Sequence, residues 1–342
     1  MSDIAVVVMN YNGRHLLGDC LASLKNLTTS VDVAVADNAS TDGSVAYLRD
    51  HYPSARVIDL KKNWGFAKGY NRALAEVHNP WLVLLNNDAA LAPDWFEHTL
   101  AAAARHPKAA VLGGKLVFGG IPAESGRVVQ SVGARFTNAG TAFEVGWGER
   151  DRGQYDRPAR TASIPGAALM IKREVFFELG GFDDDYFIYL EDVDLCWRAW
   201  LAGYEVWYEP AAVTFHRFGG FWGGRASPGR IYWMQRNRLA TMFKNLELAS
   251  LPGGLMVSLT YDLYRLVEYT ARRRFAAVRA LAAGTLAFLR GLRPILAQRR
   301  VIQRTRRLSD RDLRQMGLLV SARDAFREYR RLGKLAMSWE SA

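Results

Sequence analysis

The chain has 342 residues, and its 49% hydrophobic and 23% charged content is typical of a folded protein and excludes wholesale disorder. Its two cysteines, Cys20 and Cys196, cannot form a disulfide framework and lack a metal-binding spacing, so a reducing cytoplasm is expected. The net charge of +11 is uneven, because residues 220–342 hold 24 Lys and Arg against 8 Asp and Glu. This basic third follows a net acidic segment and predicts a polyanionic partner, either nucleic acid or an anionic membrane surface.

The sequence carries no pattern typical of secretion or of crossing a membrane. Its N-terminus lacks the basic segment and apolar run of a secretory signal. The longest apolar run, residues 280–289, lies between Arg279 and Arg290 and is far shorter than the roughly 20 residues of a spanning helix. We therefore expect a protein that at most lies on a membrane surface.

Short apolar runs alternate with helical patterns through the first 120 residues. We expect strands over residues 4–9, 31–36, 56–60 and 81–85, and helices over 16–27 and 66–77. This alternation predicts an α/β protein with βαβ units around a mainly parallel sheet, in which ligands bind beyond the carboxyl ends of the strands. Three polar clusters follow strands in this way: Asn10-Tyr11-Asn12, Asp37-Asn38 and Asn86-Asn87-Asp88.

The rest of the chain is expected to be irregular at first and helical at its end. Residues 119–165 are rich in glycine and predict loop structure over the site. Order is expected to return at 166–171, followed by a helix at 191–202, short strands at 206–208 and 213–215, and a helix from 228 towards 245. From residue 251 onward the pattern is helical and basic.

The carboxylates at the strand ends each have two interpretations. Asp88, beside two amides, suits a divalent cation that takes its other ligands from water and phosphate, or a turn that ends the strand. Asp37 can accept a hydrogen bond from a nucleobase or ribose, or can satisfy only backbone groups near a helix start. For Asp42 the local interpretation is favoured.

Later residues add three further candidates for chemistry. Glu191 and Asp192 begin the helix expected at 191–202. Neighbouring like charges would raise a carboxyl pKa there towards the range of a general base. The helix dipole would instead lower the pKa and stabilise the ionised carboxylates. His216 is a candidate metal ligand only if the fold brings Asp88 close to it. Arg236 and Arg238 can grip a diphosphate or form part of a solvated helix face.

The basic tail holds 12 arginines and one acid, Glu268, between Arg265 and Arg307. On a single continuous helix, one narrow sector would hold Arg265, Arg272, Arg279 and Arg290, opposite a mostly apolar face. A basic amphipathic helix of this kind is typical of a membrane-surface element. The alternatives are a helix packed on the globular domain and nucleic-acid binding, which is disfavoured because no nucleic-acid module surrounds the tail.

Five stretches and one histidine together resemble the family-2 glycosyltransferases, which have the GT-A fold of nucleotide-diphospho-sugar transferases. The matching stretches are residues 6–24, 35–44, 63–74, 84–91 and 166–210, with His216. They occur in the family's order, and the resemblance is nearest to the bacterial rhamnosyltransferase-like branch. It implies a GT-A catalytic domain over residues 1–245. The charge and helical pattern predict that a basic amphipathic helical region over 246–342 follows it and docks on a membrane surface.

The resemblance also implies roles for single residues. Asp192 matches the catalytic base, with Glu191 as its neighbour. Asp88 matches the last acid of the family's Asp-x-Asp metal motif and His216 a histidine that completes the site in some relatives, which implies Mg²⁺ or Mn²⁺. Asn86 stands in place of the first acid, a departure that implies weaker metal binding. The expected donor-binding residues are Tyr11, Asn12, Asp37, Asn38, Gly65, Asn86, Asn87, Gly166 and Arg236.

The activity implied is inverting transfer of a sugar, with L-rhamnose from dTDP-rhamnose favoured, to a polyprenyl-diphosphate-linked or glycan acceptor in cell-envelope synthesis. Alternative donors are UDP-galactofuranose, UDP-glucose and UDP-N-acetylhexosamine, and the alternative outside enzymes is a non-catalytic membrane-bound assembly protein. A lipid-linked acceptor favours an anionic membrane over nucleic acid as the partner of the basic third. We expect a cytoplasmic protein, peripheral on the inner face of the cell membrane, and the sequence leaves its oligomeric state open.

Overall fold

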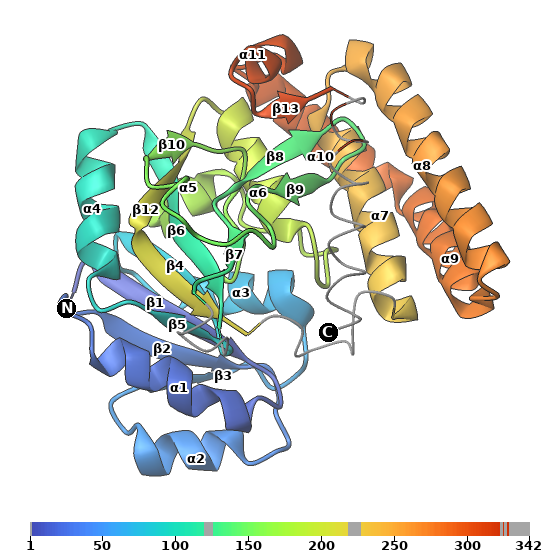
Figure 1. Cartoon of the computed structure of the whole chain (residues 1–342). Coiled ribbons are helices and arrows are strands. Elements are labelled where there is room, and N and C mark those ends of the chain that lie inside the picture. The colour runs from blue at the N-terminus through green and yellow to red at the C-terminus, as the bar shows by residue number, and fades with distance from the viewer. Residues whose placement is uncertain (1, 120–125, 218–226, 322–323, 325–326, 328–342) are drawn as a thin grey trace.

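The computed structural model describes residues 2–119, 126–217, 227–321, 324 and 327. The strands of its central sheet are β1 (Ile4–Asn10), β2 (Asp32–Asp37), β3 (Arg56–Asp59), β4 (Trp81–Asn86), β5 (Ala89–Leu91), β6 (Ala109–Phe118), β7 (Val129–Ser131), β10 (Ala159–Arg160), β11 (Ala168–Lys172) and β12 (Glu205–His216). They lie in the order β10-β12-β6-β11-β4-β1-β2-β3, with β5 added at β12 and β7 at β6 (Figure 1). The four strands predicted first are present as β1 to β4, and their pairings are parallel.

The part of the sheet beyond β4 mixes strand directions. β11 runs antiparallel to both β4 and β6, whereas β12 runs parallel to β6. β12 is one strand, so the prediction of two short strands around Pro210 is wrong. A register shift between Glu209 and Val213 accommodates the proline, which lacks an N–H for the ladder, without ending the strand.

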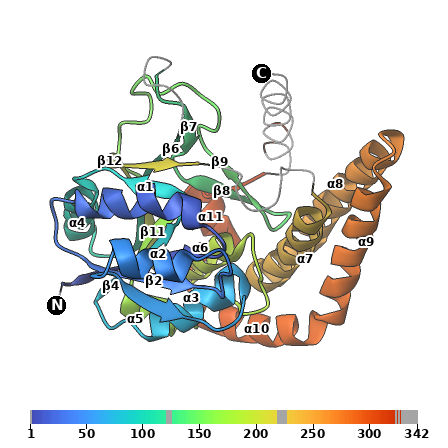
Figure 2. The same ribbon diagram turned by 90° about the horizontal axis from the view of Figure 1, so that it is seen from below.

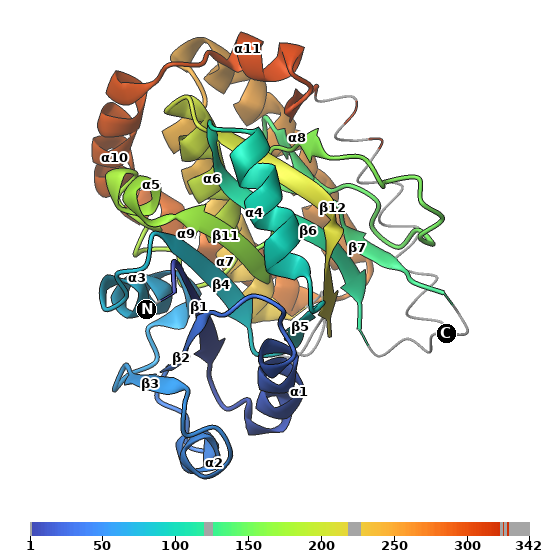
Figure 3. The same ribbon diagram turned by 90° about the vertical axis from the view of Figure 1, so that its left-hand side faces the viewer.

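Helices cover both faces of the sheet (Figures 1 and 3). They are α1 (Arg14–Lys25), α2 (Ser44–His51), α3 (Gly65–Ala75), α4 (Trp95–Arg105), α5 (Arg173–Glu178), α6 (Glu191–Leu201) and α7 (Pro228–Asn245). Alternate residues of β1 serve opposite faces: Val6 and Val8 share a buried cluster with residues of α1 and α4, and Val7 shares another with residues of α3 and α6. Burial on both faces explains why the parallel strands are apolar throughout.

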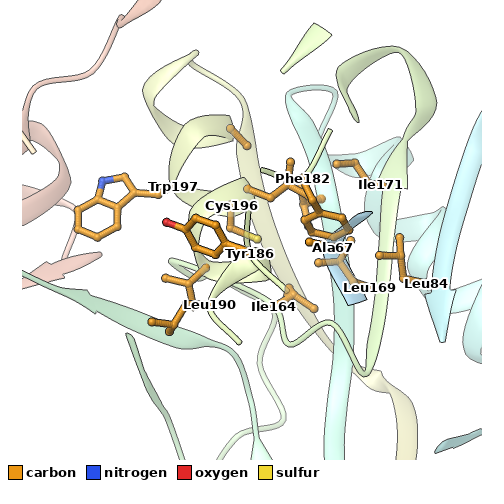
Figure 4. Packing of buried hydrophobic residues seen from close by; sticks show 14 of the residues in the cluster. Ala67, Leu84, Ile164, Leu169, Ile171, Phe182, Tyr186, Leu190, Cys196 and Trp197 are labelled. Carbon is orange, nitrogen blue, oxygen red and sulfur yellow. The ribbon is translucent and has the colours of Figure 1, made fainter. Parts of the chain in front are cut away.

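Both cysteines are buried free thiols. Cys196 lies in the core cluster with Tyr186 and Trp197 (Figure 4), and Cys20 lies in the cluster on the other face of the sheet. Burial raises the pKa of both thiols well above the ordinary value, which keeps them protonated. Both residues are therefore packing residues.

The glycine-rich stretch expected to form only loops contains short strands. β8 (Ala134–Thr137) pairs antiparallel with β9 (Ala142–Glu144) and parallel with β13 (Leu319–Val320) near the end of the described chain. Together with β7, these strands place Gln130 beside the end of β12 and Glu144 near the start of α6.

Beyond α7 the chain forms η2 (Leu248–Ser250), α8 (Leu251–Ala271), α9 (Phe275–Arg290), α10 (Leu292–Thr305) and α11 (Asp310–Gln315). The helical pattern expected from residue 251 is present. The arginine sector calculated at helical spacing does not extend over one helix, because the chain turns between α8 and α9 and Arg273 has a left-handed φ of 54°. α8 and α9 lie side by side and project to one side of the sheet (Figure 2). α7 ends at Asn245, and beyond it Phe288 and Ile295 belong to the main core cluster, so the division expected at residue 245 stays a prediction.

Within the described residues, no single helix is long and apolar enough to span a membrane. The pair α9 and α10, bent by 63° at its junction, passes the same test of length and composition when its two helices are taken together.

Candidate active site

The three polar clusters predicted from the strand ends meet at one edge of the sheet. In the sheet register Asn10 lies beside Asp37, and Met9 beside Asn86. The side-chain amide of Asn10 donates to Asp37 Oδ1 at 3.1 Å, and its oxygen accepts a hydrogen bond from Asn87 Nδ2 at 2.8 Å. These hydrogen bonds connect the ends of β1, β2 and β4, which together form one polar surface.

Several side chains expected to bind the donor hold the loops after the strands. Asp37 Oδ2 accepts a hydrogen bond from the backbone N–H of Ser40 at 2.9 Å, and Asn12 Oδ1 accepts one from the backbone N–H of Thr41 at 2.7 Å. Asp42 accepts a hydrogen bond of 2.8 Å from the first backbone N–H of α1. These contacts agree with the local interpretation, and the donor-binding roles of Asn12 and Asp37 remain proposals.

Asn38 and Gly65 join this edge to the loop before α6. Asn38 Oδ1 accepts from the backbone N–H of Trp64 at 2.9 Å, and its Nδ2 donates to Gly65 O at 2.9 Å. Gly65 has a φ of +75°, and a Cβ there would lie 2.3 Å from the carbonyl oxygen of Phe187. This close approach requires glycine at position 65, whatever its role towards a donor. Tyr11 is half-buried in the loop after β1.

Asp88 and His216, the expected metal ligands, lie side by side. β5 pairs with the end of β12 so that Ala89 is opposite His216, which puts His216 Nε2 3.1 Å from Asp88 Oδ1. His216 Nε2 is also 3.5 Å from Asn86 Nδ2. On its other side, His216 Nδ1 lies 3.0 Å from Gln130 Oε1. If Nδ1–H donates to this oxygen, Nε2 keeps its lone pair and faces the carboxylate.

This donor set fits a divalent cation that shares its coordination with a substrate. Across the part of the chain that is described, no three His, Cys, Asp or Glu side chains gather in the manner of a complete metal site. One carboxylate and one imidazole with its second nitrogen held suit Mg²⁺ or Mn²⁺ when phosphate and water oxygens supply the remaining ligands. Asp88 therefore lies close enough to His216 for both to bind one metal ion, as the metal-ligand interpretation of His216 required. Metal binding itself remains a proposal.

Asp192 lies at the first turn of α6, against the loop that precedes β11. The backbone N–H of Gly166 donates to Asp192 Oδ2 at 2.8 Å, and that of Val193 to Oδ1 at 2.7 Å. A Cβ on Gly166 would lie 2.9 Å from the Phe66 ring, so glycine permits this approach. Glu191 is buried, and its Oε2 has no hydrogen-bond partner within the described residues.

The turn that leads into this carboxylate pair has an unfavourable backbone conformation. Tyr189 and Leu190 have left-handed φ angles of 73° and 67°, which non-glycine residues rarely adopt. The side chain of Asn237 in α7 donates to the carbonyl oxygens of Ile188 at 3.0 Å and of Tyr189 at 2.8 Å. Arg236 donates to Asn237 Oδ1 at 2.9 Å and so orients the amide. α7 therefore stabilises the turn at Tyr189 and Leu190 through these hydrogen bonds.

Burial raises the pKa of three neighbouring carboxyl groups. For Asp192, burial outweighs the hydrogen bond from Gly166, so its pKa lies above the ordinary value. For Glu191, burial and then the charge of Asp192 raise the pKa well above the ordinary value. Burial also raises the pKa of Glu144, in β9, to about 8, with the charge of Asp192 adding to the effect and a hydrogen bond from Ser131 opposing it. For Glu191 and Asp192 burial therefore outweighs the stabilisation of the ionised form, whereas for Asp194 in the same turn burial is outweighed by the charges of Lys244 and Arg198, which lower its pKa.

Arg236 and Arg238 lie on the buried side of α7, so the interpretation of both as a solvated face is wrong. Arg236 lies over the Tyr186 ring at 5.4 Å and 3.6 Å from Asp185. Arg238 forms an ion pair of 2.6 Å with Asp262 in α8. The guanidinium of Arg238 thus binds α8. Contact of Arg236 with a diphosphate remains a proposal.

Sequence reasoning missed Gln130 and Glu144 and noticed Asn237 only as the neighbour of Arg236. The first two lie in the glycine-rich stretch, where neither hydrophobic period nor strand end marks a side chain as functional. For Asn237, the sequence offered only an amide residue next to an arginine in an expected helix, which does not by itself indicate a functional residue.

Solved structures with this architecture define the fold as GT-A. One is GalNAc-T7 with UDP, GalNAc and Mn²⁺ (TM-score 0.55, 15% identity, covering 71% of this chain and 48% of that chain). Another is the mannosyltransferase PcManGT from Pyrobaculum calidifontis in complex with GDP-Man and Mn²⁺ (TM-score 0.52, 17% identity, covering 84% and 87%). At such identities the likeness establishes the fold alone.

The sequence relationship is closer. Residues 5–179 match the family described as glycosyl transferase family 2. The chain is 31% identical over 235 residues to the N-acetylglucosaminyl-diphospho-decaprenol L-rhamnosyltransferase of Mycobacterium tuberculosis, which covers 63% of this chain and 76% of that protein. The chain belongs to glycosyl transferase family 2, in its rhamnosyltransferase-like branch, and is a glycosyltransferase.

Proposed function

We propose that this glycosyltransferase moves L-rhamnose from dTDP-rhamnose to a hydroxyl of a polyprenyl-diphosphate-linked acceptor. The observation that carries the proposal is the 31% identity to a relative whose name pairs L-rhamnose with a diphospho-decaprenol-linked sugar. The same site chemistry is compatible with UDP-galactofuranose, UDP-glucose or a UDP-N-acetylhexosamine as donor, and with a glycan as acceptor.

Asp192 is the proposed general base. Its carboxylate takes the proton of the acceptor hydroxyl while that oxygen attacks the anomeric carbon of the donor. The bond from this carbon to the diphosphate oxygen breaks, and the nucleoside diphosphate leaves from the opposite face with inversion. The raised pKa of Asp192 supports this role, because a more basic carboxylate accepts the proton more readily. Glu191, adjacent and buried, has a pKa raised well above its ordinary value by burial and by the charge of Asp192, which leaves the negative charge of the pair on Asp192.

The donor is proposed to lie along the edge formed by the strand ends. Tyr11, Asn12, Asp37, Asn38 and Gly65 would surround the nucleoside, and Asn86, Asn87, Gly166 and Arg236 the diphosphate and sugar. Asp88 and His216 would hold Mg²⁺ or Mn²⁺, and the short distance between their side chains supports the pairing. When bound, such an ion neutralises the charge that develops on the leaving diphosphate. Gln130 keeps the His216 ring in the orientation that points Nε2 at Asp88.

The region 246–342 is proposed to dock the enzyme on an anionic membrane, with the protein peripheral on the inner face of the cell membrane. The supporting observation is its arginine content, which favours an anionic surface. A lipid-linked acceptor would reach the base only if the enzyme worked close to the bilayer.

The test is a screen of nucleotide sugars with a short polyprenyl-diphospho-N-acetylglucosamine, followed by mass spectrometry of the lipid product. We expect rhamnose transfer from dTDP-rhamnose to exceed transfer from any other donor by about tenfold or more, a difference of about 1.4 kcal/mol in the barrier. Faster transfer of another sugar would overturn the donor assignment. Transfer only to a lipid-free glycan would overturn the acceptor assignment.

A further inference from the structure

The helix α8 has its polar and apolar faces in the reverse of the usual arrangement. Its inward face carries Asp262, which accepts hydrogen bonds from Arg238 at 2.6 Å and from Gln235 at 2.9 Å, both from α7. Ser258, on the same face, accepts a hydrogen bond of 2.6 Å from Arg238. A helix of a water-soluble domain turns its apolar face to the core. In α8, Leu251 and Leu255 of the first turns pack against the core, and the middle of the helix is attached through this polar network.

The opposite face of α8 is apolar and exposed. We call it the α8 outer face; it comprises Met256 (67% exposed), Leu259 (66%), Leu263 (62%), Tyr264 (59%) and Val267 (60%). The charged residues of α8, Asp262, Arg265 and Glu268, are all only partly exposed. The exposed positions of the helix are therefore uncharged, and large apolar side chains predominate among them, beside Thr260 and Thr270. Exposed apolar patches mark contacts with a protein or a membrane.

A cationic cluster lies at the end of this face. Arg272, Arg273 and Arg274 follow α8 directly and are all exposed, and the next residue, Phe275, is 59% exposed. An apolar helix face next to arginines and aromatic side chains is the composition of helices that lie in the interface of anionic bilayers. The hairpin of α8 and α9 projects from the molecule, so the described part of the fold leaves this face open (Figure 2).

We propose that the α8 outer face inserts into an anionic phospholipid bilayer, with Arg272, Arg273 and Arg274 at the headgroups. This deepens the proposed function and rests on it in one respect, because a polyprenyl-linked acceptor is itself held in a bilayer. A second copy of the chain fits less well, because pairing would bring together two strongly basic regions.

The same helix that holds α8 also clamps the catalytic turn. In α7, Arg238 binds Asp262 of α8, and its neighbour Asn237 binds the carbonyl of Tyr189 before Glu191 and Asp192. Two helices, α8 and α7, therefore lie between a bilayer on the α8 outer face and the turn that leads to the base. α7 thus links the docking helix to the catalytic turn through direct side-chain contacts.

The first experiment measures binding of the full chain to vesicles of 70% phosphatidylcholine and 30% phosphatidylglycerol by co-sedimentation. The variant Leu259→Gln/Leu263→Gln/Val267→Gln is expected to bind at least tenfold more weakly. The variant Arg272→Gln/Arg273→Gln/Arg274→Gln is expected to lose about 100-fold, near fivefold per arginine, and to bind these vesicles no better than pure phosphatidylcholine. The matched control Lys25→Gln/Arg49→Gln/Arg56→Gln removes three exposed cations from the far side of the sheet and is expected to stay within twofold.

The second experiment reports insertion directly. Because Cys20 and Cys196 are buried, Leu263→Cys can be labelled selectively with an environment-sensitive dye, with Phe177→Cys on α5 as the labelled control. We expect a blue shift of the emission at position 263, and none at 177, when the anionic vesicles are added. No shift at 263, or equal vesicle binding by all variants, would overturn the proposal.

The oligomeric state and the activity distinguish the remaining outcomes. A dimer that the α8 variant converts to a monomer while vesicle binding persists would assign this face to a second copy and overturn the proposal. Vesicle binding needs neither donor nor acceptor, so its failure is separable from failure of the proposed function. With a water-soluble acceptor analogue the α8 variant is expected to retain wild-type turnover.

Discussion

The side-chain amide of Asn237 donates a hydrogen bond to the carbonyl oxygen of Tyr189 at 2.8 Å, and so fixes a residue with a left-handed φ of 73°. Tyr189 stands two residues before Glu191, at the entrance to the helix that carries Asp192. A backbone conformation of this kind is disfavoured by about 1–3 kcal/mol and persists only where its surroundings hold it. Asn237 is thus a positioning residue for the proposed base.

Asn237→Ala is expected to lower kcat by about 10- to 100-fold with little change in the KM for the donor, because the base is displaced while the nucleotide edge stays intact. Asn237→Asp, which retains an oxygen but not the donor N–H groups, is expected to lose as much. Steady-state kinetics checks both. Asn79→Ala removes a comparable bridging amide far from the site and should leave kcat unchanged; an equal loss there would assign the effect to stability.

Asp192→Asn is expected to reduce transfer on the order of 10³-fold, because the amide cannot accept the hydroxyl proton. Donor binding, measured by calorimetry with the nucleoside diphosphate, is expected to persist. Near-normal turnover by this variant would rule out Asp192 as the base.

The raised pKa of Asp192 predicts the acidic limb of the activity profile. Only the ionised carboxylate accepts a proton, so kcat/KM is expected to rise with pH through an apparent pKa above the 3.8 of an ordinary aspartate. Initial rates between pH 4 and 8, with circular dichroism as a check of folding, measure it. Activity that stays constant down to pH 4 would contradict the prediction.

Removal of divalent metal by EDTA is expected to abolish transfer, and Mg²⁺ or Mn²⁺ to restore it. His216→Ala and Gln130→Ala are each expected to weaken Mn²⁺ binding by about 10- to 100-fold in the presence of nucleoside diphosphate, because one removes a ligand and the other its orienting partner. His98→Ala is the matched control, since His98 lies 3.2 Å from Asp94 in an exposed histidine–aspartate pair. Activity indifferent to EDTA would exclude the metal site.

Glu144 predicts a pH dependence of stability. Its pKa is about 8 in the folded protein against an ordinary 4.5, so its favourable contribution is complete below pH 4.5 and is lost as pH rises to about 8. Glu144→Gln is therefore expected to raise Tm relative to wild type more at pH 8 than at pH 5. Even a one-unit difference corresponds to about 1.4 kcal/mol, or about 2 °C or more. Differential scanning calorimetry, with the exposed Glu97→Gln as control, checks this; equal shifts at both pH values would refute it.

Much of the catalytic fold follows from local patterns. The apolar runs that became β1 to β4 are short and evenly separated by helical spacing, and both kinds of period depend only on neighbouring residues. The rule that ligands bind at the carboxyl ends of parallel strands then led to Asn10, Asp37 and Asn86, which do meet at one edge. Pro210 misled the strand prediction, because a bulge in β12 depends on its partner β6.

The sequence predicted the residues proposed for catalysis and metal binding, but not the residues that hold them in position. Asp88 and His216 are 128 positions apart, and their contact was inferred from the family resemblance before the pairing of β5 with β12 placed them together. Gln130 and Glu144 carry no local signal, since their surroundings come from strands and helices distant in sequence. The same holds for the contact of Asn237 with Tyr189.

The sequence by itself determined a parallel α/β sheet, the polar strand ends and a basic helical tail, because periodicity and charge are properties of neighbouring residues. Only the tertiary structure decided which way each face of that tail points. From the sequence, four arginines were placed on one sector opposite an apolar face, with a membrane surface favoured as their partner. In the structure Arg238 and Gln235 of α7 bind the polar side of α8, so the apolar side is left outside. A helical pattern specifies that two faces differ, and the partner helix decides which of them is buried.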